Sequence, residues 1–440
     1  MLATPSVYDA CALLFERASG AADSDAAGRA AEEARRLLAA FGVTPDGSDE
    51  DGRTARLFRL AATLEASFAV PATDYPGLTV LGARLRRPAG GGAAIAADGV
   101  IGCDPSPWRA FQKCIGEAAE TMALAAPGIG DAARDGGIET IGPRFAGQVE
   151  ARTGMDSAAA LDAAPVVGGT ELATGRPVLV PRPLVFGPSD GLRAAVPVSE
   201  GCAAGPTLED ATRSAVFELV ERHVVAHWWH GGRPARRLPQ ALMAAAIGRL
   251  RPGVGTPWPR QGFALELDAD GLPLAVVAAA SVSPVHGLVA LGFAARPGRA
   301  AALEAAVLEM VQSEIANDLL FLRLRRAGPA PAPADQARLA AKRRLRPETL
   351  LATAQDDAAE GSTGAPDSLP GLLAGIVRRG IAIFRVDLTG RAGIPVVKLL
   401  SPDLQPSSAA AMTEGLRQTA SQFGRPLNDL IERPAIFNSL

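Results

Sequence analysis

The sequence predicts a mixed α/β (α+β) fold, in which β-sheets pack against long helices and follow a helical N-terminal appendage. Apolar residues recur every three to four positions through residues 1–72, which is typical of amphipathic helices. From Pro76 onward, short apolar runs bounded by glycine are typical of strands, and long helical segments lie between them. A chain of 440 residues suits two or three domains, or one large unit with an appendage. We therefore expect an appendage at 1–72 and one larger domain at 73–440.

The larger domain begins with two predicted strands and a helix. Leu78–Leu85 is strand-like, and a second short run of this kind is Asp98–Cys103. A serine cap then precedes Pro107, and proline is favoured at the first helical position. The helix that begins there carries Glu117 and Glu120 among apolar neighbours. At this spacing the two carboxylates lie on the same side of the helix.

Residues 173–198 contain two further strand-like segments, PVLVPRPLVF and LRAAVPV, and a small-residue loop follows them. The loop leads into Thr207–His230, which is predicted to form one long helix. Thr207 can cap this helix, because Asp210 stands at the capping-box spacing. Most of its circumference is apolar, which is typical of a buried helix. One narrow stripe is nevertheless polar and carries Ser214, Glu218, Glu221 and Arg222.

The next part predicts an antiparallel sheet and a third long helix. Residues 262–295 contain strand-like runs, and the Asp-Ala-Asp-Gly sequence at 268–271 is typical of a hairpin turn. The helix at about 300–326 carries Glu309 and Gln312, which are again three residues apart. The sequence thus repeats a spacing that brings two polar side chains to one side of a helix.

The last part of the chain predicts a linker and two strands. A proline- and alanine-rich sequence follows the third helix, and we expect a mobile segment near 327–369. Residues 380–389 and 394–402 are strand-like, and the tail beyond them shows little pattern.

Charge and composition exclude several classes of protein. The net charge is −3, with 44 basic and 47 acidic residues, so we expect no nucleic-acid or anionic-membrane binding by bulk charge. The four cysteines form no CxxC pair, which argues against a disulfide scaffold or a structural zinc site. We see neither a signal-peptide pattern nor an apolar run near the ~18 residues of a membrane span. These observations favour a cytoplasmic enzyme or binding protein.

The paired carboxylates indicate a metal or phosphate site. An isolated ExxE pair usually lies on a solvated helix face, but these two pairs lie on otherwise apolar helices. Buried like charges need a cation, a proton or a ligand between them. Nucleotide-bound Mg²⁺ takes a few carboxylates and completes its shell with phosphate oxygens and water. Arg222 could then pair with phosphate. The chain has no Walker A sequence and no convincing GxGxxG, so the common nucleotide folds are disfavoured.

These segments resemble the YcaO family of ATP-dependent enzymes. SAVFELVER at 214–222 is similar to the family's SxxxExxER, and SEGCAAGPTLEDA before it is similar to SNGxAAGxTxEEA. GEAAET at 116–121 resembles the family's GExxER. TGRPVLVPRPLVF, the third long helix and DLTGRAGIPVVKLLSPDLQP follow in the family's order. The resemblance covers about Pro76–Pro406 and identifies 73–440 as a YcaO-like, ATP-binding catalytic domain.

The resemblance implies an enzyme that uses ATP and Mg²⁺ to activate a peptide backbone amide by O-phosphorylation. Attack by a Cys, Ser or Thr side chain would give an azoline, attack by sulfide a thioamide, and attack by an amine an amidine. The implied partners are a ribosomally made precursor peptide, a leader-binding or sulfur-delivery accessory protein, and a second copy of the chain in a homodimer.

The resemblance also implies a role for each matching residue. Four carboxylates would bind magnesium, two of them would act with an arginine in catalysis, and further polar residues would hold the nucleotide. The magnesium ligands would be Glu117, Glu120, Glu218 and Glu221; the catalytic residues Glu218, Glu221 and Arg222; and the nucleotide-binding residues Ser199, Ser214, Arg222, Glu309 and Gln312.

A second hypothesis is a degenerate, non-catalytic YcaO subunit that binds a precursor peptide or supports a partner enzyme. Five positions depart from the family's pattern, and four of them, 113, 121, 200 and 305, favour this hypothesis. The family usually has Ser at position 113, Asn at 200, and Arg at 121, 305 and 314. The chain has Lys113, Glu200, Thr121, Ala305 and Glu314 at these positions. It therefore keeps the glutamates of the implied site but lacks several of the serine, asparagine and arginine side chains that the family usually has with them.

Overall fold

The computed structural model describes most of the chain from Arg53 onward, namely residues 53–61, 63–85, 99–125, 130–134, 137–150, 157–186, 193–194, 199–328, 331–352, 354–355, 368–390, 393–409, 411–426 and 436. The helical appendage expected at 1–72 therefore lies mostly outside the described residues. Its described end contains helix α3 (Arg53–Ala61), where a helix was predicted.

The helical prediction for residues 1–72 is wrong just beyond α3, because Ala66–Ala69 forms strand β1. β1 pairs antiparallel with β2 (Thr79–Arg84). The ring of Phe68 occupies the space beside Gly82, where an added Cβ would lie 2.4 Å from the ring atom Cε2. Pairing with a distant strand thus overrides the helical periodicity of the local sequence.

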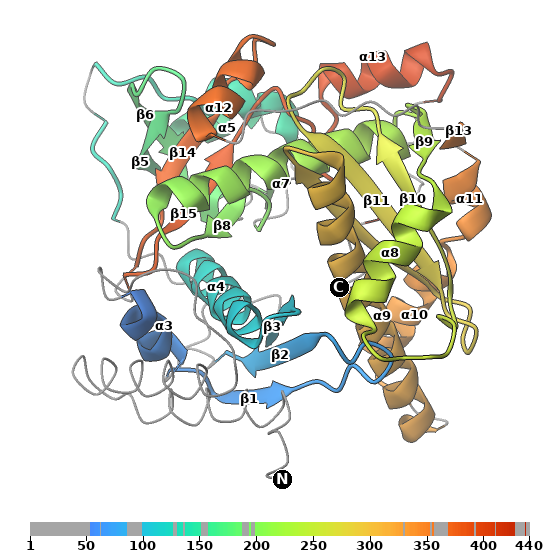
Figure 1. Ribbon diagram of the computed structural model, residues 1–440. Coiled ribbons are helices and arrows are strands. Elements are labelled where there is room, and N and C mark those ends of the chain that lie inside the picture. The colour runs from blue at the N-terminus through green and yellow to red at the C-terminus, as the bar shows by residue number, and fades with distance from the viewer. Residues whose placement is uncertain are drawn as a thin grey trace.

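Three sheets surround the centre of the molecule (Figure 1). The first has the order β1, β2, β3 (Gly99–Asp104). The second has the order β12 (Val289–Arg296), β11 (Ala275–Val282), β10 (Gln261–Leu267), β9 (Ala235–Arg237), β13 (Ala354–Gln355). The third has the order β6 (Pro177–Pro181), β5 (Val166–Glu171), β14 (Phe384–Asp387), β15 (Val396–Leu400), β8 (Cys202–Ala204). A small separate pair joins β4 (Val149–Glu150) and β7 (Arg193–Ala194).

Three long helices pack among these sheets, as the sequence predicts: α4 (Pro107–Ala125), α7 (Leu208–Trp229) and α9 (Arg299–Ala327). α4 packs on β2 and β3, and α9 packs on β11 and β12. α7 contacts β15 of the third sheet and β12 of the second, so it joins the two sheets (Figure 1). Its apolar residues Val220, Val224 and Trp228 belong to a core that also contains Val276 and Leu399 of these sheets.

Shorter elements complete the described fold. They are the 3₁₀ helix Gly142–Gln148 and the helices α5 (Ser157–Ala163), α6 (Arg182–Phe186), α8 (Gln240–Leu250), α10 (Pro333–Arg343), α11 (Pro347–Leu351), α12 (Leu369–Val377) and α13 (Glu414–Gln422). Within the described residues, no helix is both long and apolar enough to cross a lipid bilayer.

Local sequence explains where α7 begins and how the chain turns between β10 and β11. The hydroxyl of Thr207 accepts a hydrogen bond from the Asp210 N–H at 3.0 Å and donates one to the Asp210 carboxylate at 2.7 Å, which confirms the predicted cap of α7. The predicted hairpin between β10 and β11 is also confirmed. Asp270 and Gly271 have positive φ angles of 52° and 72°, the conformation that a tight turn of this kind requires.

Two helices approach their strands closely because the strands carry glycine. An added Cβ on Gly102 of β3 would lie 1.9 Å from the carbonyl oxygen of Ala110 in α4. An added Cβ on Gly292 of β12 would lie 2.1 Å from the carbonyl oxygen of Ala306 in α9. Backbone therefore packs directly on backbone at both places, which brings helix side chains within reach of the strand N–H groups.

One further segment differs from the sequence predictions. The strand predicted through PRPLVF ends at Pro181, and the next five residues form α6. Pro183 lies in that helix and lacks the N–H that a continuing strand would use. The segment near 327–369 contains α10, α11 and β13, while residues 356–367 lie outside the described part.

Candidate functional site

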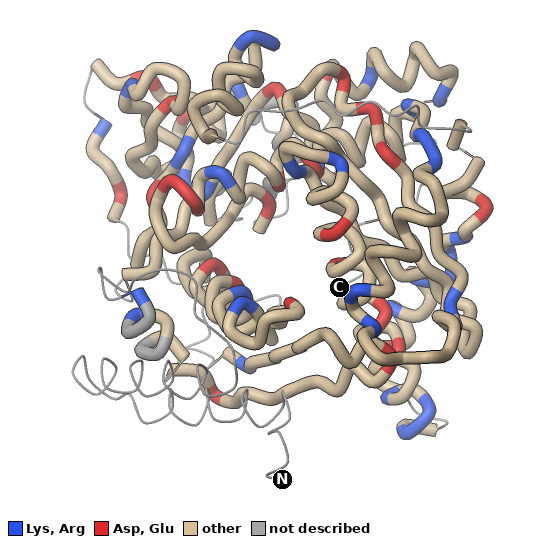
Figure 2. Tube along the Cα trace, in the orientation of Figure 1, with Lys and Arg blue, Asp and Glu red and all other residues tan. Residues whose placement is uncertain are grey.

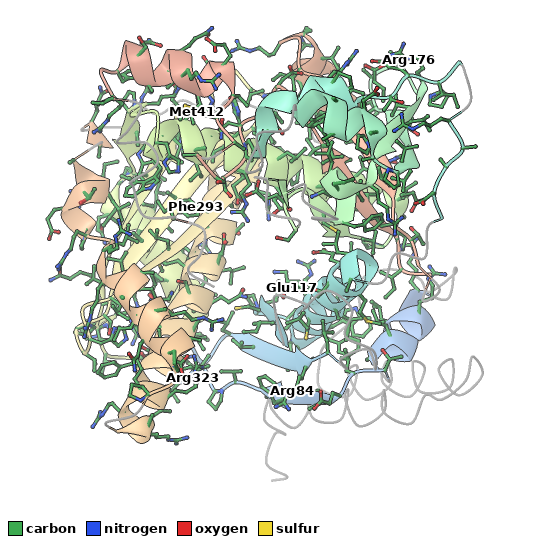
Figure 3. The ribbon with its side chains drawn as sticks, turned by 180° about the vertical axis from the view of Figure 1, so that it is seen from behind. Arg84, Glu117, Arg176, Phe293, Arg323 and Met412 are labelled. Carbon is green, nitrogen blue, oxygen red and sulfur yellow. The ribbon has the colours of Figure 1, made fainter. Side chains whose placement is uncertain are left out.

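A cavity of about 830 Å³ is bounded by α4, α7 and α9, and all three helices direct carboxylates into it. Acidic and basic segments gather around this centre in Figure 2, and Figure 3 shows Glu117 of α4 and Phe293 of β12 on either side of it. Glu221 is 8% exposed, and the other carboxylates are more open. The acids that line the cavity from the three helices are Glu117, Glu120, Glu218, Glu221 and Glu309.

Three of these carboxylates are held by backbone N–H groups of edge strands. The N–H of Ile101 in β3 donates to Glu117 at 2.9 Å, and the N–H of Ala204 in β8 donates to Glu120 at 2.7 Å. The N–H of Phe293 in β12 donates to Glu309 at 2.8 Å. β3, β8 and β12 each lie at the edge of a different sheet. All three sheets therefore orient acids of the same cavity.

The polar stripe of α7 forms the third wall. One Nη atom of Arg222 lies 3.0 Å from Glu221 Oε1, and the other lies 3.4 Å from Glu218 Oε1. Ser214 also lines the cavity, one helical turn before Glu218. The guanidinium is thus fixed between two carboxylates and keeps its planar group at the cavity, where it could meet a phosphate.

The remaining nucleotide-binding candidates separate into two groups. Gln312 lines the cavity one turn after Glu309 on α9. Ser199 is exposed in the turn before β8 and is not among the residues that line the cavity. The structure thus brings together all the residues implied by the family resemblance except Ser199.

Desolvation raises the pKa of the acids in this cavity. It raises the pKa of Glu117 to about 7 and that of Glu221 to about 8, and it places the pKa of Glu120 well above the ordinary range. The pKa values of Glu218 and Glu309 are raised for the same reason, and the charge of Arg222 opposes the rise. A bound cation would relieve the cost of ionising these groups.

The donor set fits magnesium held together with a nucleotide. Carboxylate oxygens are the ligands that Mg²⁺ prefers, and nucleotide-bound Mg²⁺ needs only one or two of them. Across the described ranges, no three His, Cys, Asp or Glu side chains are placed to hold one metal ion by themselves. Glu117, Glu120, Glu218 and Glu221 therefore suit ions that complete their coordination with phosphate oxygens and water.

Two of the five positions that depart from the family pattern face the cavity. Lys113 and Ala305 line it, and Lys113 donates a hydrogen bond to Asp104 at 2.8 Å. Thr121 does not line it; its hydroxyl donates to the backbone oxygen of Glu117 at 2.9 Å.

The other two departures point elsewhere. Glu200 lines a smaller neighbouring cavity, where its carboxylate accepts hydrogen bonds from the N–H of Ser407 at 3.2 Å and from the Ser407 hydroxyl. Lys398 donates to the backbone oxygen of Glu200. Glu314 lies outside the cavity and accepts a hydrogen bond from Tyr75. Three of the five departures therefore lie outside the lining of the carboxylate cavity.

Besides Arg222, the cavity has basic residues that sequence reasoning did not assign to it. Among the residues that the structure describes, six acidic and six basic ones line the cavity, so its acids have cations nearby. Arg296 could have been noticed, because it ends the strand just before the third long helix. Arg53 and Arg56 precede the stretch that resembles the family and gave no such signal. The basic residues are Arg53, Arg56, Arg109, Lys113, Arg222 and Arg296.

Solved structures define the class of protein to which this fold belongs. A YcaO protein from Methanopyrus kandleri bound with AMPPCP and Mg²⁺ is 19% identical, with a TM-score of 0.55 over 88% of this chain and 93% of that one. A heterocyclase in complex with substrate and cofactor is 16% identical (TM-score 0.54), and the match covers 85% of this chain and 53% of the heterocyclase. The E. coli microcin synthetase McbBCD complex contains a chain that is 12% identical (TM-score 0.54), with 77% and 88% covered. The fold is therefore that of the YcaO proteins and related heterocyclases.

The sequence match is more specific. Residues 150–405 match the model of a family described as YcaO cyclodehydratase, ATP- and Mg²⁺-binding. The chain belongs to the YcaO family, and its domain is of the ATP- and Mg²⁺-binding kind. No curated protein matches the sequence. The family match begins after Glu117 and Glu120, so the tertiary structure is what joins α4 to the site.

Proposed function

We propose that the chain is an enzyme that uses ATP and Mg²⁺ to O-phosphorylate a backbone amide of a ribosomally made peptide. One observation carries this proposal: carboxylates of α4, α7 and α9 meet Arg222 in one cavity of about 830 Å³. Acids with raised pKa values beside a fixed guanidinium suit a ligand that combines a divalent cation with phosphate. Membership of an ATP- and Mg²⁺-binding family supports the same ligand.

The proposed reaction has two steps. The amide oxygen attacks the γ-phosphorus of ATP, and the bond from that phosphorus to the bridging oxygen breaks, so that ADP leaves. A nucleophile then adds to the amide carbon and gives its proton to solvent, and the amide nitrogen also gives up its proton where the product is an azoline or an amidine. The bond from the carbon to the former amide oxygen breaks, and inorganic phosphate carries that oxygen away. A Cys, Ser or Thr side chain gives an azoline, sulfide gives a thioamide, and an amine gives an amidine.

The chain's own residues act by binding and orienting the reactants. Magnesium supplies charge neutralisation at the phosphates, and Glu117, Glu120, Glu218 and Glu221 are its proposed ligands. Arg222 is placed to meet phosphate oxygens. Ser214, Glu309 and Gln312 are the proposed hydrogen-bonding groups for the nucleotide. Phosphoryl transfer depends mostly on positioning and charge neutralisation, so it requires no covalent protein nucleophile.

Nucleotide binding by the purified chain tests this proposal. We expect calorimetry to show Mg²⁺-dependent binding of AMPPNP, which Glu218→Ala abolishes. Phosphate release from ATP should require a precursor peptide, taken from those encoded beside the gene, and should be lost in the same variant. Glu209→Ala is the matched control, because Glu209 is exposed in the first turn of α7. AMPPNP binding that survives Glu218→Ala combined with Glu117→Ala would show that the site is assigned wrongly.

We also propose a precursor peptide, an accessory protein for leader binding or sulfur delivery, and a homodimer as the working assembly. Two relatives of the same fold support the first two partners. One heterocyclase structure holds substrate and cofactor, and the microcin synthetase is a complex that has also been solved with pro-MccB17 bound. Size-exclusion chromatography with light scattering measures the homodimer directly.

The second candidate is a non-catalytic YcaO subunit. Lys113 and Ala305 favour it, because both departures from the family pattern face the cavity. This candidate predicts binding of the precursor peptide or of a partner enzyme without phosphate release, even when purified partners are present. Peptide-dependent phosphate release that is lost in Glu218→Ala contradicts it.

A further inference from the structure

The chain concentrates positive charge in one region outside the cavity. Residues 323–346 cover the end of α9, all of α10 and the turn before α11. This basic region contains seven arginines and one lysine but a single acidic residue, whereas the whole chain has a net charge of −3. None of its described residues lines the cavity. The region therefore has no part in the site described above.

The basic region lies on the surface, and the end of α9 carries it (Figure 1). α10 buries none of its residues, and all seven arginines of the region are exposed. An Nη atom of Arg323 in α9 lies 3.0 Å from Oδ1 of Asp335, which ties the first turn of α10 to α9. Figure 3 shows Arg323 near the lower end of α9, outside the central cavity. A partner molecule can therefore reach these charges from solvent.

The positive charges of α10 repel one another. Arg338 and Lys342 are four residues apart on this helix, a spacing at which like charges destabilise a helix by about 0.2–0.5 kcal/mol. Burial and then the charge of Arg338 lower the pKa of Lys342 to about 8. A bound anion would relieve this repulsion.

One face of α9 combines this charge with exposed leucine. Leu319, Leu322, Arg323 and Arg326 follow the i, i+3, i+4, i+7 spacing, so they lie on the same side of the helix. Leu319 is 37% exposed and Leu322 is 43% exposed, and they are the two large apolar side chains that α9 exposes. Apolar surface beside positive charge fits a polypeptide segment that carries both apolar and acidic side chains.

Two other polyanions fit this surface less well. Proteins that bind single-stranded nucleic acid stack its bases on aromatic side chains, and residues 322–350 contain no aromatic residue. A helix that lies on a lipid surface needs a broad apolar face, whereas α9 offers two leucines here. One helix and one face of another also make a surface whose width suits a peptide segment. An acidic peptide is therefore the favoured ligand.

We propose that α10 and the face of α9 with Leu319, Leu322, Arg323 and Arg326 form a docking surface for an acidic, amphipathic segment of the precursor peptide. Carboxylates of the segment pair with the arginines, and its apolar side chains cover the two leucines. This inference rests on the proposed function for the identity of the peptide. The docking surface lies outside the nucleotide cavity, so each of the two assignments can fail without the other.

Fluorescence anisotropy of labelled peptides with the full chain tests the docking surface. The probes are the precursor peptides encoded beside the gene and a synthetic peptide with leucine at every third or fourth position and glutamate between. Arg326→Glu combined with Arg338→Glu should weaken binding of both probes about tenfold, or about 1.4 kcal/mol, because it replaces attraction by repulsion. Leu319→Ser combined with Leu322→Ser should also weaken it about tenfold, because it removes the apolar contact.

Arg378→Glu combined with Arg417→Glu is the matched control. It reverses the same number of exposed arginines, at the end of α12 and in α13, and should bind both probes like wild type. All three double variants should keep the wild-type melting temperature and Mg²⁺·AMPPNP affinity, because the changed side chains are exposed and lie outside the cavity. The inference is wrong if the Arg326 and Arg338 variant binds the precursor like wild type, or if the synthetic peptide binds and no precursor does.

Duplex DNA and phosphatidylserine vesicles in the same assay separate a peptide from other polyanions. Tighter binding of either one than of the precursor overturns the proposal, as does precursor binding that does not depend on Leu319 and Leu322. Absence of AMPPNP binding in the wild-type chain would contradict the proposed function instead. Peptide binding and its loss in the two surface variants would then still decide the role of the docking surface.

Discussion

Two glutamates of helix α9, Glu309 and Glu314, lie five residues apart, and their surroundings give them different roles. Glu309 lines the cavity and accepts a backbone N–H. Glu314 is 1% exposed and accepts hydrogen bonds from Tyr75 at 2.5 Å and from the Ser281 hydroxyl, while Arg260 lies 3.1 Å away. A buried acid whose oxygens all interact with protein groups stabilises the fold, whereas an acid that lines a cavity can bind a ligand.

The largest expected effect is the loss of stability when Glu314 is removed. Glu314→Ala leaves the buried Tyr75 hydroxyl without its acceptor and removes one of the two carboxylates beside Arg260, so we expect the free energy of unfolding to fall by about 3–5 kcal/mol. Urea denaturation measures it. Glu304→Ala is the control on the same helix, because the pair between Glu304 and Arg249 is exposed and worth at most about 1 kcal/mol. Equal losses in the two variants would contradict a structural role for Glu314.

A second effect is the pH dependence of stability in the absence of ligand. Burial raises the pKa of Glu314 from 4.5 to about 7, and that of Glu221 to about 8. The folded state therefore binds these protons more tightly than the unfolded state does. The resulting stabilisation is full below pH 4.5 and disappears as the pH rises through the folded pKa.

Two conservative variants separate these contributions. The raised pKa of Glu314 corresponds to at most about 3 kcal/mol of stability. Glu314→Gln should remove the part of the pH-dependent loss of stability that ends near pH 7. Glu221→Gln should remove the part of the stability loss that continues to about pH 8. In the wild-type protein, binding of Mg²⁺·AMPPNP should suppress the same part of the loss. Denaturation curves at a series of pH values provide the measurement. Difference curves that stay flat between pH 4.5 and 8 would contradict the raised pKa values.

The smallest of the three effects concerns Glu309. Glu309→Gln keeps a carbonyl oxygen that can accept the Phe293 N–H, so the melting temperature should stay near that of wild type. The lost charge should weaken Mg²⁺·AMPPNP binding about tenfold, or about 1.4 kcal/mol. Calorimetry of this variant beside Glu314→Gln tests the comparison directly. Stronger damage to nucleotide binding by Glu314→Gln than by Glu309→Gln would reverse the two roles.

Local sequence predicted much of the fold. The three long helices, the cap at Thr207, the hairpin at 268–271 and the mixed sheet-and-helix class are all confirmed. Each depends on interactions within a few residues: helical periodicity, a side-chain cap or a positive φ angle. The strand at Ala66–Ala69 was missed, because only its pairing with β2 distinguishes it from a continued helix.

The sequence by itself determined which carboxylates share a helix face, because i,i+3 and i,i+4 spacing is a property of one helix. Tertiary structure alone decided which faces meet. Glu120 is held by the N–H of Ala204, 84 residues further along the chain, and Glu314 by Tyr75, 239 residues away. Contacts over such separations depend on how sheets and helices pack, here through the close approaches at Gly102 and Gly292. Packing therefore placed Glu309 of α9 in the site and Glu314 of the same helix in the protein core.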